Sequence, residues 1–511
     1  MSRIIFEPDV PVTPTDLART DVACFVGLVR RRVRVPPQPL PKPKVDWLRE
    51  HGWIDGPMAR DVSSLFDVPM PIENFAAFQS LYDDGHSASA VGTDYLALAV
   101  QAFFAQSGKR CYVVRMGDPI DAKSTSNRGD IVSLLLSDDS SEQDQRSWHG
   151  IAHLWGLPDA SFLLLPDLPL LHAPAVAVAP GVTEDVSRGP EQFVRCVPPA
   201  EETKDTRVYS LPAPRFDLNA YDAWGGTLKT IVGRLSTGVL REVQFVAALP
   251  MPLDTESLPS ALAKVFPETR ADGGISASSA FVQLAYPWLR TTRSQIVLEG
   301  LEAPDGTLAG MLARNALVRG TFTSATKIPP VDLVDLVPDL PTEETQVPEQ
   351  KPTWTGEETA RPLVVRVSLF GFTPAGIRLL SDVTTFPGES YRPAPVNRLV
   401  SVISRAARHF GETHVFESNG PRLWGALERT IRNLLTKLWS LGAFEGATPA
   451  EAFNVRCSRD TMTQNDIDLG RIIGVVSFQA AASIELITVT LTVQAGAATD
   501  AEIAAQMVGP I

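Results

Sequence analysis

The sequence predicts an α/β (α+β) fold, with a layered α/β body followed by a C-terminal α/β unit and extended arms at both ends of the chain. Short apolar runs of strand length, such as residues 21–29 and 160–167, alternate with stretches of helical periodicity. A segment rich in proline and acidic residues, 329–362, separates the two parts. The length of 511 residues, 44% of them hydrophobic, is enough for several domains.

In the predicted body, short apolar strands follow helices along the chain. Residues 21–29 are rich in Val and Phe, which predicts a buried strand, and the proline-rich stretch after them predicts a surface excursion. Within residues 95–116 a helix with Leu96, Val100 and Phe103 on one face leads through a glycine turn into the strand CYVVRM. Further buried strands are expected at 160–167, 241–250 and 278–290.

The C-terminal unit is expected to open with the strand 363–372 and to continue with a helix over 396–410. A second helix is predicted from Pro421 to Leu441, because a proline occupies its first turn and Gly442 follows its end. Its buried stripe is predicted to hold Trp424, Leu427, Ile431, Leu434 and Leu438.

The final strand is predicted within residues 483–494, where apolar and polar side chains alternate. A long two-faced strand near the end of the chain offers an edge for pairing with another chain. We therefore predict that this strand contacts a neighbouring subunit. Its apolar face holds Ile487, Val489, Leu491 and Val493.

These observations divide the chain into six parts, whose boundaries are predictions. They are an N-terminal arm with the first strand (1–30), a proline-rich insertion (31–70), the α/β body (71–328), a linker or surface loop (329–362), the C-terminal unit (363–494) and a C-terminal arm (495–511).

Composition argues against several classes of protein. The net charge is −13, and the one basic cluster, Arg30–Arg34, runs directly into prolines, so nucleic-acid binding is not expected. The four cysteines lie far apart, which excludes a zinc ribbon and favours reduced core residues. The first residues lack the apolar core of a signal peptide, and the most apolar window contains Asp and prolines, so neither a cleaved leader nor membrane insertion is expected.

The polar loop within residues 454–479 is the first candidate for a site. Asp466 and Asp468 have the spacing of calcium ligands, but Gly470 comes one position early and Val476 stands where an EF-hand has its glutamate. We interpret the loop as a hairpin connection whose polar side chains cap a short helix. No metal and no cofactor is predicted.

The alternative is a soluble α/β enzyme, a hydrolase or a metal-dependent transferase. His149 and His153 are four residues apart, as two metal ligands on a helix would be, but the glutamate of the HExxH motif is missing. Asp118 and Asp167 are the acidic candidates for such a site. The sequence also lacks a phosphate-binding loop and a GxSxG motif, so a non-enzymatic protein is favoured.

Several stretches resemble, in their order along the chain, the contractile tail sheath proteins of phage tails, tailocins and extracellular contractile injection systems. The resemblance spans most of the chain and is most specific in the C-terminal third. The stretches are FVG (25–27), YLALAVQAFFAQSGKRCYVVRM (95–116), LLLPDL (163–168), FVQLAYPWL (281–289), GTLAGMLARN (306–315), VNRLVSVI (396–403), VFESNGPRLWGAL (415–427) and LGAFEGATPAEAFNVRCSRDTMTQNDIDLGRIIGVV (441–476).

This resemblance implies a structural subunit that assembles with itself in rings or a helical array around an inner tube, with baseplate and terminal cap proteins as further partners. Such a particle is assembled in the cytoplasm of the producer cell. The resemblance also implies that the helix from Pro421 grips the tube. The basic residues on its other sides are Arg422, Arg429, Arg432 and Lys437, with Glu428 the only acid.

Two departures from the family pattern leave an alternative within it. The chain opens with IIFEPDVPVTP where the family has an arm of the PGVYVEE kind, and the stretch after FVG has the character of an insertion. The second possibility is therefore a sheath-like subunit next to the baseplate, or a cap, that does not itself contract.

Overall fold

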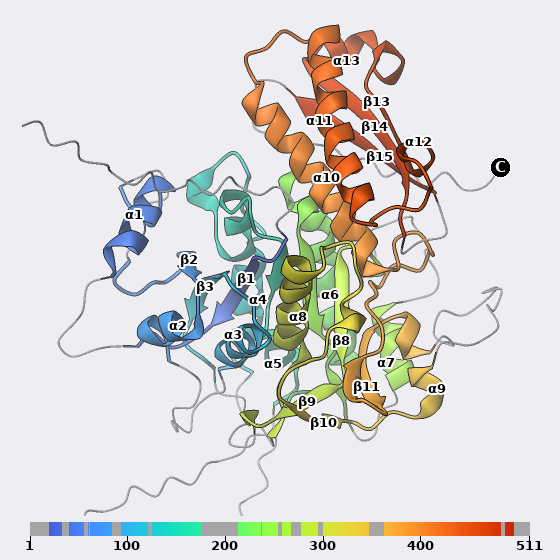
Figure 1. Ribbon diagram of the computed structural model, residues 1–511. Helices are drawn as coiled ribbons and strands as arrows, with labels where there is room; N and C mark the ends of the chain where they lie inside the picture. The colour runs from blue at the N-terminus through green and yellow to red at the C-terminus, as the bar shows by residue number, and fades with distance from the viewer. Residues whose placement is uncertain are drawn as a thin grey trace, which may run out of the picture.

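The computed structural model of the chain contains an α/β body and a smaller C-terminal unit (Figure 1). The residues that it describes are 20–32, 40–55, 60, 62–83, 94–120, 125–175, 213–236, 238–253, 258–266, 277–294, 300–346, 362–481 and 486–494.

The body is organised around an eight-stranded sheet with the order β12-β11-β8-β6-β4-β1-β3-β2. The six inner strands are parallel, whereas β2 and β12 are antiparallel to their neighbours at the two edges. The predicted α/β class is thereby confirmed. The strands are β1 (Ala23–Leu28), β2 (Met70–Ile72), β3 (Cys111–Gly117), β4 (Phe162–Leu164), β6 (Gln244–Ala248), β8 (Val282–Tyr286), β11 (Ser368–Thr373) and β12 (Gly376–Leu379).

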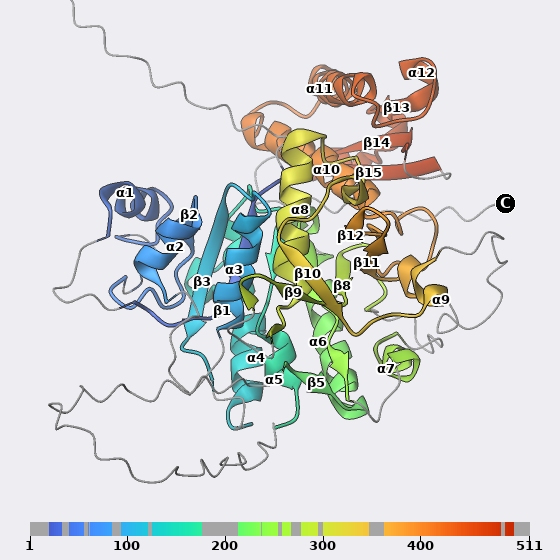
Figure 2. The same ribbon diagram turned by 60° about the horizontal axis from the view of Figure 1, so that its bottom comes forward.

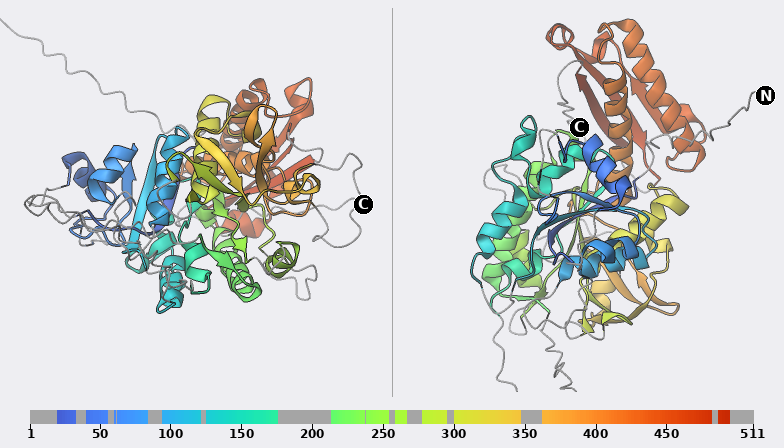
Figure 3. Two further views of the ribbon diagram at one scale, coloured as in Figure 1. Left: turned by 90° about the horizontal axis from the view of Figure 1, so that it is seen from below. Right: turned by 90° about the vertical axis from the view of Figure 1, so that its left-hand side faces the viewer.

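Helices cover both faces of this sheet (Figure 3, right). Every residue of β1 is buried, and alternate side chains enter two separate cores: Cys24 and Val26 on one face, Ala23 and Phe25 on the other. Burial on both faces explains why the parallel strands are continuous apolar runs. The helices of the body are α1 (Lys42–Glu50), α2 (Phe75–Leu81), α3 (Tyr95–Ala105), α4 (Arg128–Leu136), α5 (Leu168–His172), α6 (Leu218–Leu235), α7 (Leu258–Val265) and α8 (Pro304–Val318).

Helices α3 and α8 lie side by side at unusually short range (Figure 2). A side chain at Gly306 would come within 2.4 Å of the carbonyl oxygen of Ala99, and one at Gly310 within 2.5 Å of that of Phe103. These two glycines, four residues apart on α8, allow the backbones to touch and so fix how α8 seats on the body.

The segment 329–362, predicted as a linker or surface loop, contains regular structure in its described part. Strand β10 (Leu333–Val337) pairs antiparallel with β9 (Trp288–Thr291), and the short helix α9 (Thr342–Thr345) follows. Most of the prolines and acids that suggested a linker flank this strand, and the acid within it, Asp335, pairs with Arg290 of β9 at 3.8 Å. A second small pair joins β5 (Arg215–Phe216) and β7 (Met251–Pro252).

The strand expected to open the C-terminal unit belongs to the body instead. Strand β11 pairs parallel with β8, and β12 then forms the edge of the same sheet. Sequence order alone does not reveal which sheet accepts a strand, and here the chain returns to the body after the segment 329–362. The separate C-terminal core begins only with α10.

The C-terminal unit packs two long helices on one face of an antiparallel sheet, β13-β14-β15. Alternate residues of β14 are buried, so this sheet has one core face and one outer face. The elements are α10 (Ala394–Thr413), α11 (Pro421–Ser440), α12 (Pro449–Ala452), β13 (Phe453–Arg456), α13 (Gln464–Asp468), β14 (Arg471–Gln479) and β15 (Leu486–Gln494).

Helix α10 attaches this unit to the body through buried ion pairs. Arg398 makes two hydrogen bonds to Asp382, of 3.1 and 2.7 Å. Arg405 and Arg408 both donate to Glu242, at 3.3 Å and twice at 2.9 Å. All five side chains are at least nine-tenths buried. These charged side chains are removed from water, so each depends on its ion-pair partner. The contact between α10 and the body therefore relies on these buried ion pairs.

Candidate functional site: an outward helix face and an open strand edge

Helix α11 presents its basic side chains to solvent, as the sequence predicted. Its buried side chains are Leu423, Trp424, Leu427, Ile431, Leu435 and Leu438. At about 100° per residue, Arg422 and Arg429 lie directly opposite the centre of that stripe. Lys437 and Arg432 lie to either side of them. All four are exposed.

The four basic residues are not equivalent. Arg432 donates to Glu428 at 2.6 Å and to the carbonyl oxygen of Val455 at 3.2 Å, so it holds the helix against β13. Among the described residues, no carboxylate lies within 4.0 Å of the charged groups of Arg422, Arg429 and Lys437. We call these three exposed basic residues the α11 stripe, to be distinguished from the buried apolar stripe of the same helix.

One residue of the predicted apolar stripe is misplaced. Leu434 is only partly buried, whereas its neighbour Leu435 is fully buried. The predicted stripe also omitted Leu423. Leu423 and Leu435 extend the core side of α11 beyond the single stripe that we predicted, because this side covers both α10 and the sheet.

The last strand, predicted as an inter-subunit strand, has its apolar side chains inside the domain. Ile487, Val489, Leu491 and Val493 are 0–7% exposed and pack in the core that β15 shares with α10. They are not free to contact another subunit. The backbone is different: among the described residues β15 pairs only with β14, and no other described strand pairs with its second edge.

The loop that raised the question of calcium is a connection between β13 and β14 with two capping boxes. Thr463 caps α13, and the carboxylate of Asp466 accepts a hydrogen bond from the Thr463 backbone at 2.9 Å. The bonds from Thr463 lower the pKa of Asp466. Asp468 accepts from Gln464 at 2.8 Å. The predicted capping role is confirmed.

His149 and His153 share a partner that the sequence did not reveal. His149 Nδ1 lies 2.6 Å from one oxygen of Asp67, and His153 Nε2 lies 2.7 Å from the other. Arg60 approaches the same carboxylate at 3.5 Å. Burial would raise the pKa of Asp67, but the bonds from His153 and His149 lower it overall. The cluster fastens the segment before β2 to the short helix Gly150–Gly156.

Asp167 lies at the point in the parallel sheet where doubly wound enzymes bind their ligands. It follows β4, and its carboxylate accepts a hydrogen bond of 2.6 Å from the Leu28 backbone at the end of β1. Gly27 leaves the room for it, since a side chain there would come within 2.1 Å of the carboxylate. Burial raises the pKa of Asp167 to about 8.

The enzyme alternative requires these residues to share one site. Asp118 pairs with Arg115 at 2.8 Å, and the buried Asp167 bonds to the Leu28 backbone. Among the described residues, no hydrogen bond or ion pair joins either acid to His149 or His153. Within the described ranges, no group of three or more His, Cys, Asp and Glu side chains has an arrangement that could bind a metal ion. In the same ranges, no helix is both long and apolar enough to cross a bilayer.

The predicted core role of three cysteines is confirmed. Cys24, Cys111 and Cys457 are unpaired and buried, and burial raises the pKa of the Cys457 thiol to about 12. Cys196 lies outside the described residues, as do the predicted arms 1–19 and 495–511.

No protein-family model matches this sequence, and no curated protein matches it. Solved structures do match, over nearly the whole chain. A chain of the contracted baseplate of the anti-feeding prophage has a TM-score of 0.56 at 16% identity, covering 95% of each chain. A chain of its six-fold symmetrised baseplate has a TM-score of 0.54 at 16% identity, covering 94% of this chain and 95% of the other.

The helical sheath of the anti-feeding prophage, in its contracted state, also matches. Its TM-score is 0.52 at 17% identity, covering 95% of this chain and 96% of the sheath chain. A match of this extent includes the body, the C-terminal unit and their connection. The chain therefore has the fold of the contractile sheath subunits, as its sequence predicted.

Proposed function

We propose that this chain is a structural subunit of the contractile sheath around the inner tube of a phage tail or a phage-tail-like injection system. The observation that supports this most is the match in fold over about 95% of both chains to a helical sheath in its contracted state. Contraction of such a sheath would drive the tube through a target envelope.

Self-association would use the open edge of β15 together with the terminal arms. Strand addition joins subunits by main-chain hydrogen bonds, which hold neighbours together while each body can pivot. The burial of Ile487, Val489, Leu491 and Val493 within the unit supports this version of the contact, because it leaves the backbone edge rather than the side chains for the neighbour.

The energy for contraction would be stored when the sheath assembles. The extended array is then a trapped arrangement, and contraction lets the bodies repack into one of lower free energy. Such a mechanism needs no nucleotide, metal or catalytic residue, and we propose that the chain is not an enzyme. The burial of Asp167 and its bond to the Leu28 backbone, at the point of the sheet where doubly wound enzymes bind their ligands, support this view.

The inner tube would dock on the outer face of α11. A row of exposed cations that have no carboxylate partner in the described part of the chain, on a protein of net charge −13, is suited to an acidic surface. Ion pairs at an exposed surface are weak. Such pairs would set the register of the sheath on the tube during assembly and would break during contraction. Baseplate and cap proteins would bind at the two ends of the array, and assembly would take place in the cytoplasm of the producer cell.

A second candidate is a sheath-like subunit that lies next to the baseplate, or a cap, and does not contract. Two of the three similar structures described above are baseplates, which favours it. Electron microscopy of the purified chain separates the two: a contractile sheath subunit should form tubes of many rings, whereas a baseplate-proximal or cap subunit should stop at single rings.

Negative-stain microscopy also tests the proposal as a whole. Rings, tubes or ordered arrays are expected, and a monodisperse monomer at high concentration with its tube present would refute it. Deletion of residues 495–511 should abolish these arrays and leave a folded monomer. If the truncated chain still assembles normally, the C-terminal arm does not join subunits.

A further inference from the structure

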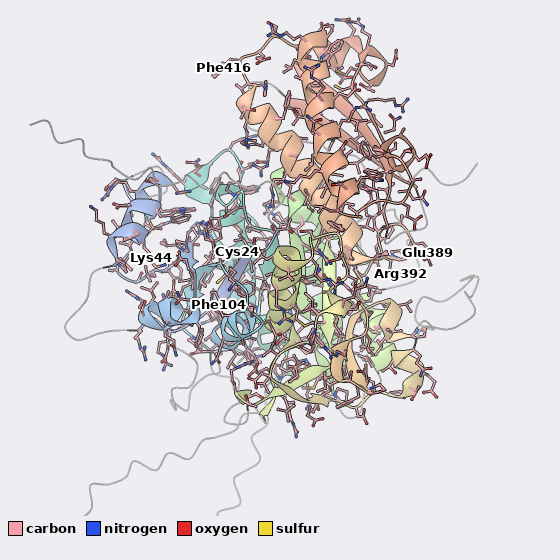
Figure 4. The ribbon with its side chains drawn as sticks, viewed as in Figure 1. Cys24, Lys44, Phe104, Glu389, Arg392 and Phe416 are labelled. Carbon is pink, nitrogen blue, oxygen red and sulfur yellow. The ribbon has the colours of Figure 1, made fainter. Side chains whose placement is uncertain are left out.

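The loop between α10 and α11 displays a fully exposed aromatic side chain. Phe416 has a relative exposure of 102%, higher than that of any other large apolar side chain in the described part of the chain. Figure 4 shows it at the end of the C-terminal unit farthest from the body. A large apolar side chain in water is unfavourable, so its position requires an explanation.

The loop that carries Phe416 is fixed rather than loose. The amide of Asn419 donates to the carbonyl oxygens of Ile467 and Arg471, at 3.3 and 3.1 Å, and accepts from the Trp424 indole at 2.7 Å. On the other side, the His414 ring stacks on Phe410 with centroids 4.0 Å apart. The aromatic ring is thus held in solvent by a loop that is anchored at both ends.

The loop that carries Phe416 is connected to two features that also face outward. Leu469, 49% exposed, follows α13, to which Asn419 ties the loop. Six residues after Phe416, Arg422 begins the α11 stripe with Arg429 and Lys437. An exposed aromatic side chain near cations that have no carboxylate partner among the described residues is typical of a binding interface, since aromatic residues dominate binding hot spots.

We propose that Phe416 is the apolar anchor of the interface whose electrostatic part is the α11 stripe. Its partner is an acidic protein surface with an apolar socket, and this rests on the proposed function, under which that surface belongs to the inner tube. Charge complementarity argues for this partner: the stripe has three cations and no carboxylate partner among the described residues. The stripe would bring the tube into register, and insertion of Phe416 would slow its release.

The test uses the full-length chain and preassembled inner tubes of the same particle in co-sedimentation. Phe416→Ser should weaken tube binding roughly thirtyfold, in line with a hot-spot aromatic residue. The loss should persist at high salt, because burial of an apolar ring is not screened. Phe416→Trp should restore binding. The matched control is Phe372→Ser, which removes another exposed phenylalanine (56%) from the β11–β12 hairpin of the body.

Four outcomes decide the proposal. Loss of tube binding by Phe416→Ser alone, with the melting temperature and tube-free assembly unchanged, supports it. Wild-type binding by Phe416→Ser overturns it, and the proposed function survives if the chain still forms arrays. If Phe416→Ser abolishes the arrays that the chain forms in the absence of the tube, the proposal is also overturned, because Phe416 then contacts a second copy of this chain. Equal losses from Phe372→Ser overturn it as well, since the effect is then not specific to the loop.

Discussion

Two consecutive helices of the C-terminal unit carry arginines in opposite environments. On α10, Arg398, Arg405 and Arg408 are 4–8% exposed and bind Asp382 and Glu242. On α11, Arg422 and Arg429 are exposed and have no carboxylate within reach in the described part of the chain. The first set joins two parts of one chain, and the second is available to another molecule. Residue type alone does not distinguish a structural cation from a binding one; burial and partners do.

The largest effect is expected at Glu242. Glu242→Ala would remove the buried carboxylate that Arg405 and Arg408 share and leave Arg408 only its pair with the half-exposed Glu412, so it should lower the free energy of unfolding by about 3–5 kcal/mol. Chemical denaturation measures this. The matched control is Glu428→Ala on α11, which breaks the exposed pair with Arg432 and should cost less than about 1 kcal/mol. Equal, small losses in the two variants would show that α10 is not clamped to the body.

Asp167 extends the comparison to a buried acid without a cation. Its pKa is raised to about 8, whereas an unfolded aspartate has a pKa near 3.9. The unfolded chain therefore loses the proton first, and this group makes stability fall as pH rises from about 4 to about 8. Asp167→Asn keeps an acceptor for Leu28 and should remove that fall, up to about 1.4 kcal/mol per pH unit. Thermal melts from pH 5 to 8 test it; identical slopes in both proteins would contradict it.

His153 has the opposite pH dependence. Burial lowers its pKa despite the hydrogen bond that its ring makes to the Asp67 carboxylate. The unfolded chain then takes up the proton first, so stability is complete above about pH 6.5 and is lost as pH falls. His153→Gln should flatten the melting temperature between pH 6.5 and 5. A steeper loss in the variant would mean that the histidine is charged in the folded protein.

Reversal of charge on α11 should leave stability nearly unchanged and affect binding. Replacing Arg422, Arg429, Arg432 and Lys437 together by Glu should abolish tube co-sedimentation at low salt. The triple variant that spares Arg432 is the cleaner test, because Arg432 also bonds to Glu428 and Val455 within the unit. Wild-type tube binding by the triple variant would remove α11 as the docking face.

The smallest effect is expected from chelation. Asp466 completes the capping box of α13, Asp468 accepts a hydrogen bond from Gln464, and His149 and His153 bond to Asp67, so both groups already have partners. Dialysis against EDTA should change neither the melting temperature nor assembly. A fall of several degrees that calcium or zinc reverses would point to a bound ion.

Hydrophobic periodicity predicted the helices and strands in which buried residues recur at a regular spacing. β1, α3, α11 and β15 were found in this way, because one face or one run of each is apolar. The same reasoning missed β10, whose short run of Val and Leu is broken by Asp335 and ended by Pro338. It also assigned β11 to the wrong unit, since strand pairing depends on partners that lie far away in the sequence.

The contacts that fix the site were less predictable. Asp67 lies 82 residues before His149, and nothing in the sequence around either one indicates the other. The arginines of α10 have the spacing of an ordinary polar helix face, and only the fold reveals that this face meets Glu242. The α11 stripe was found because its helix has a single core side, which leaves the other side to solvent.

The most direct test of the central claim is a cryo-EM reconstruction of this chain assembled on its inner tube. The account predicts an array of subunits in which α10 remains docked on its own body and the outer face of α11 lies against the tube. Arg422 and Arg429 should then be opposite tube carboxylates. An array in which α11 faces away from the tube, or a C-terminal unit detached from Glu242 and Asp382, would contradict it.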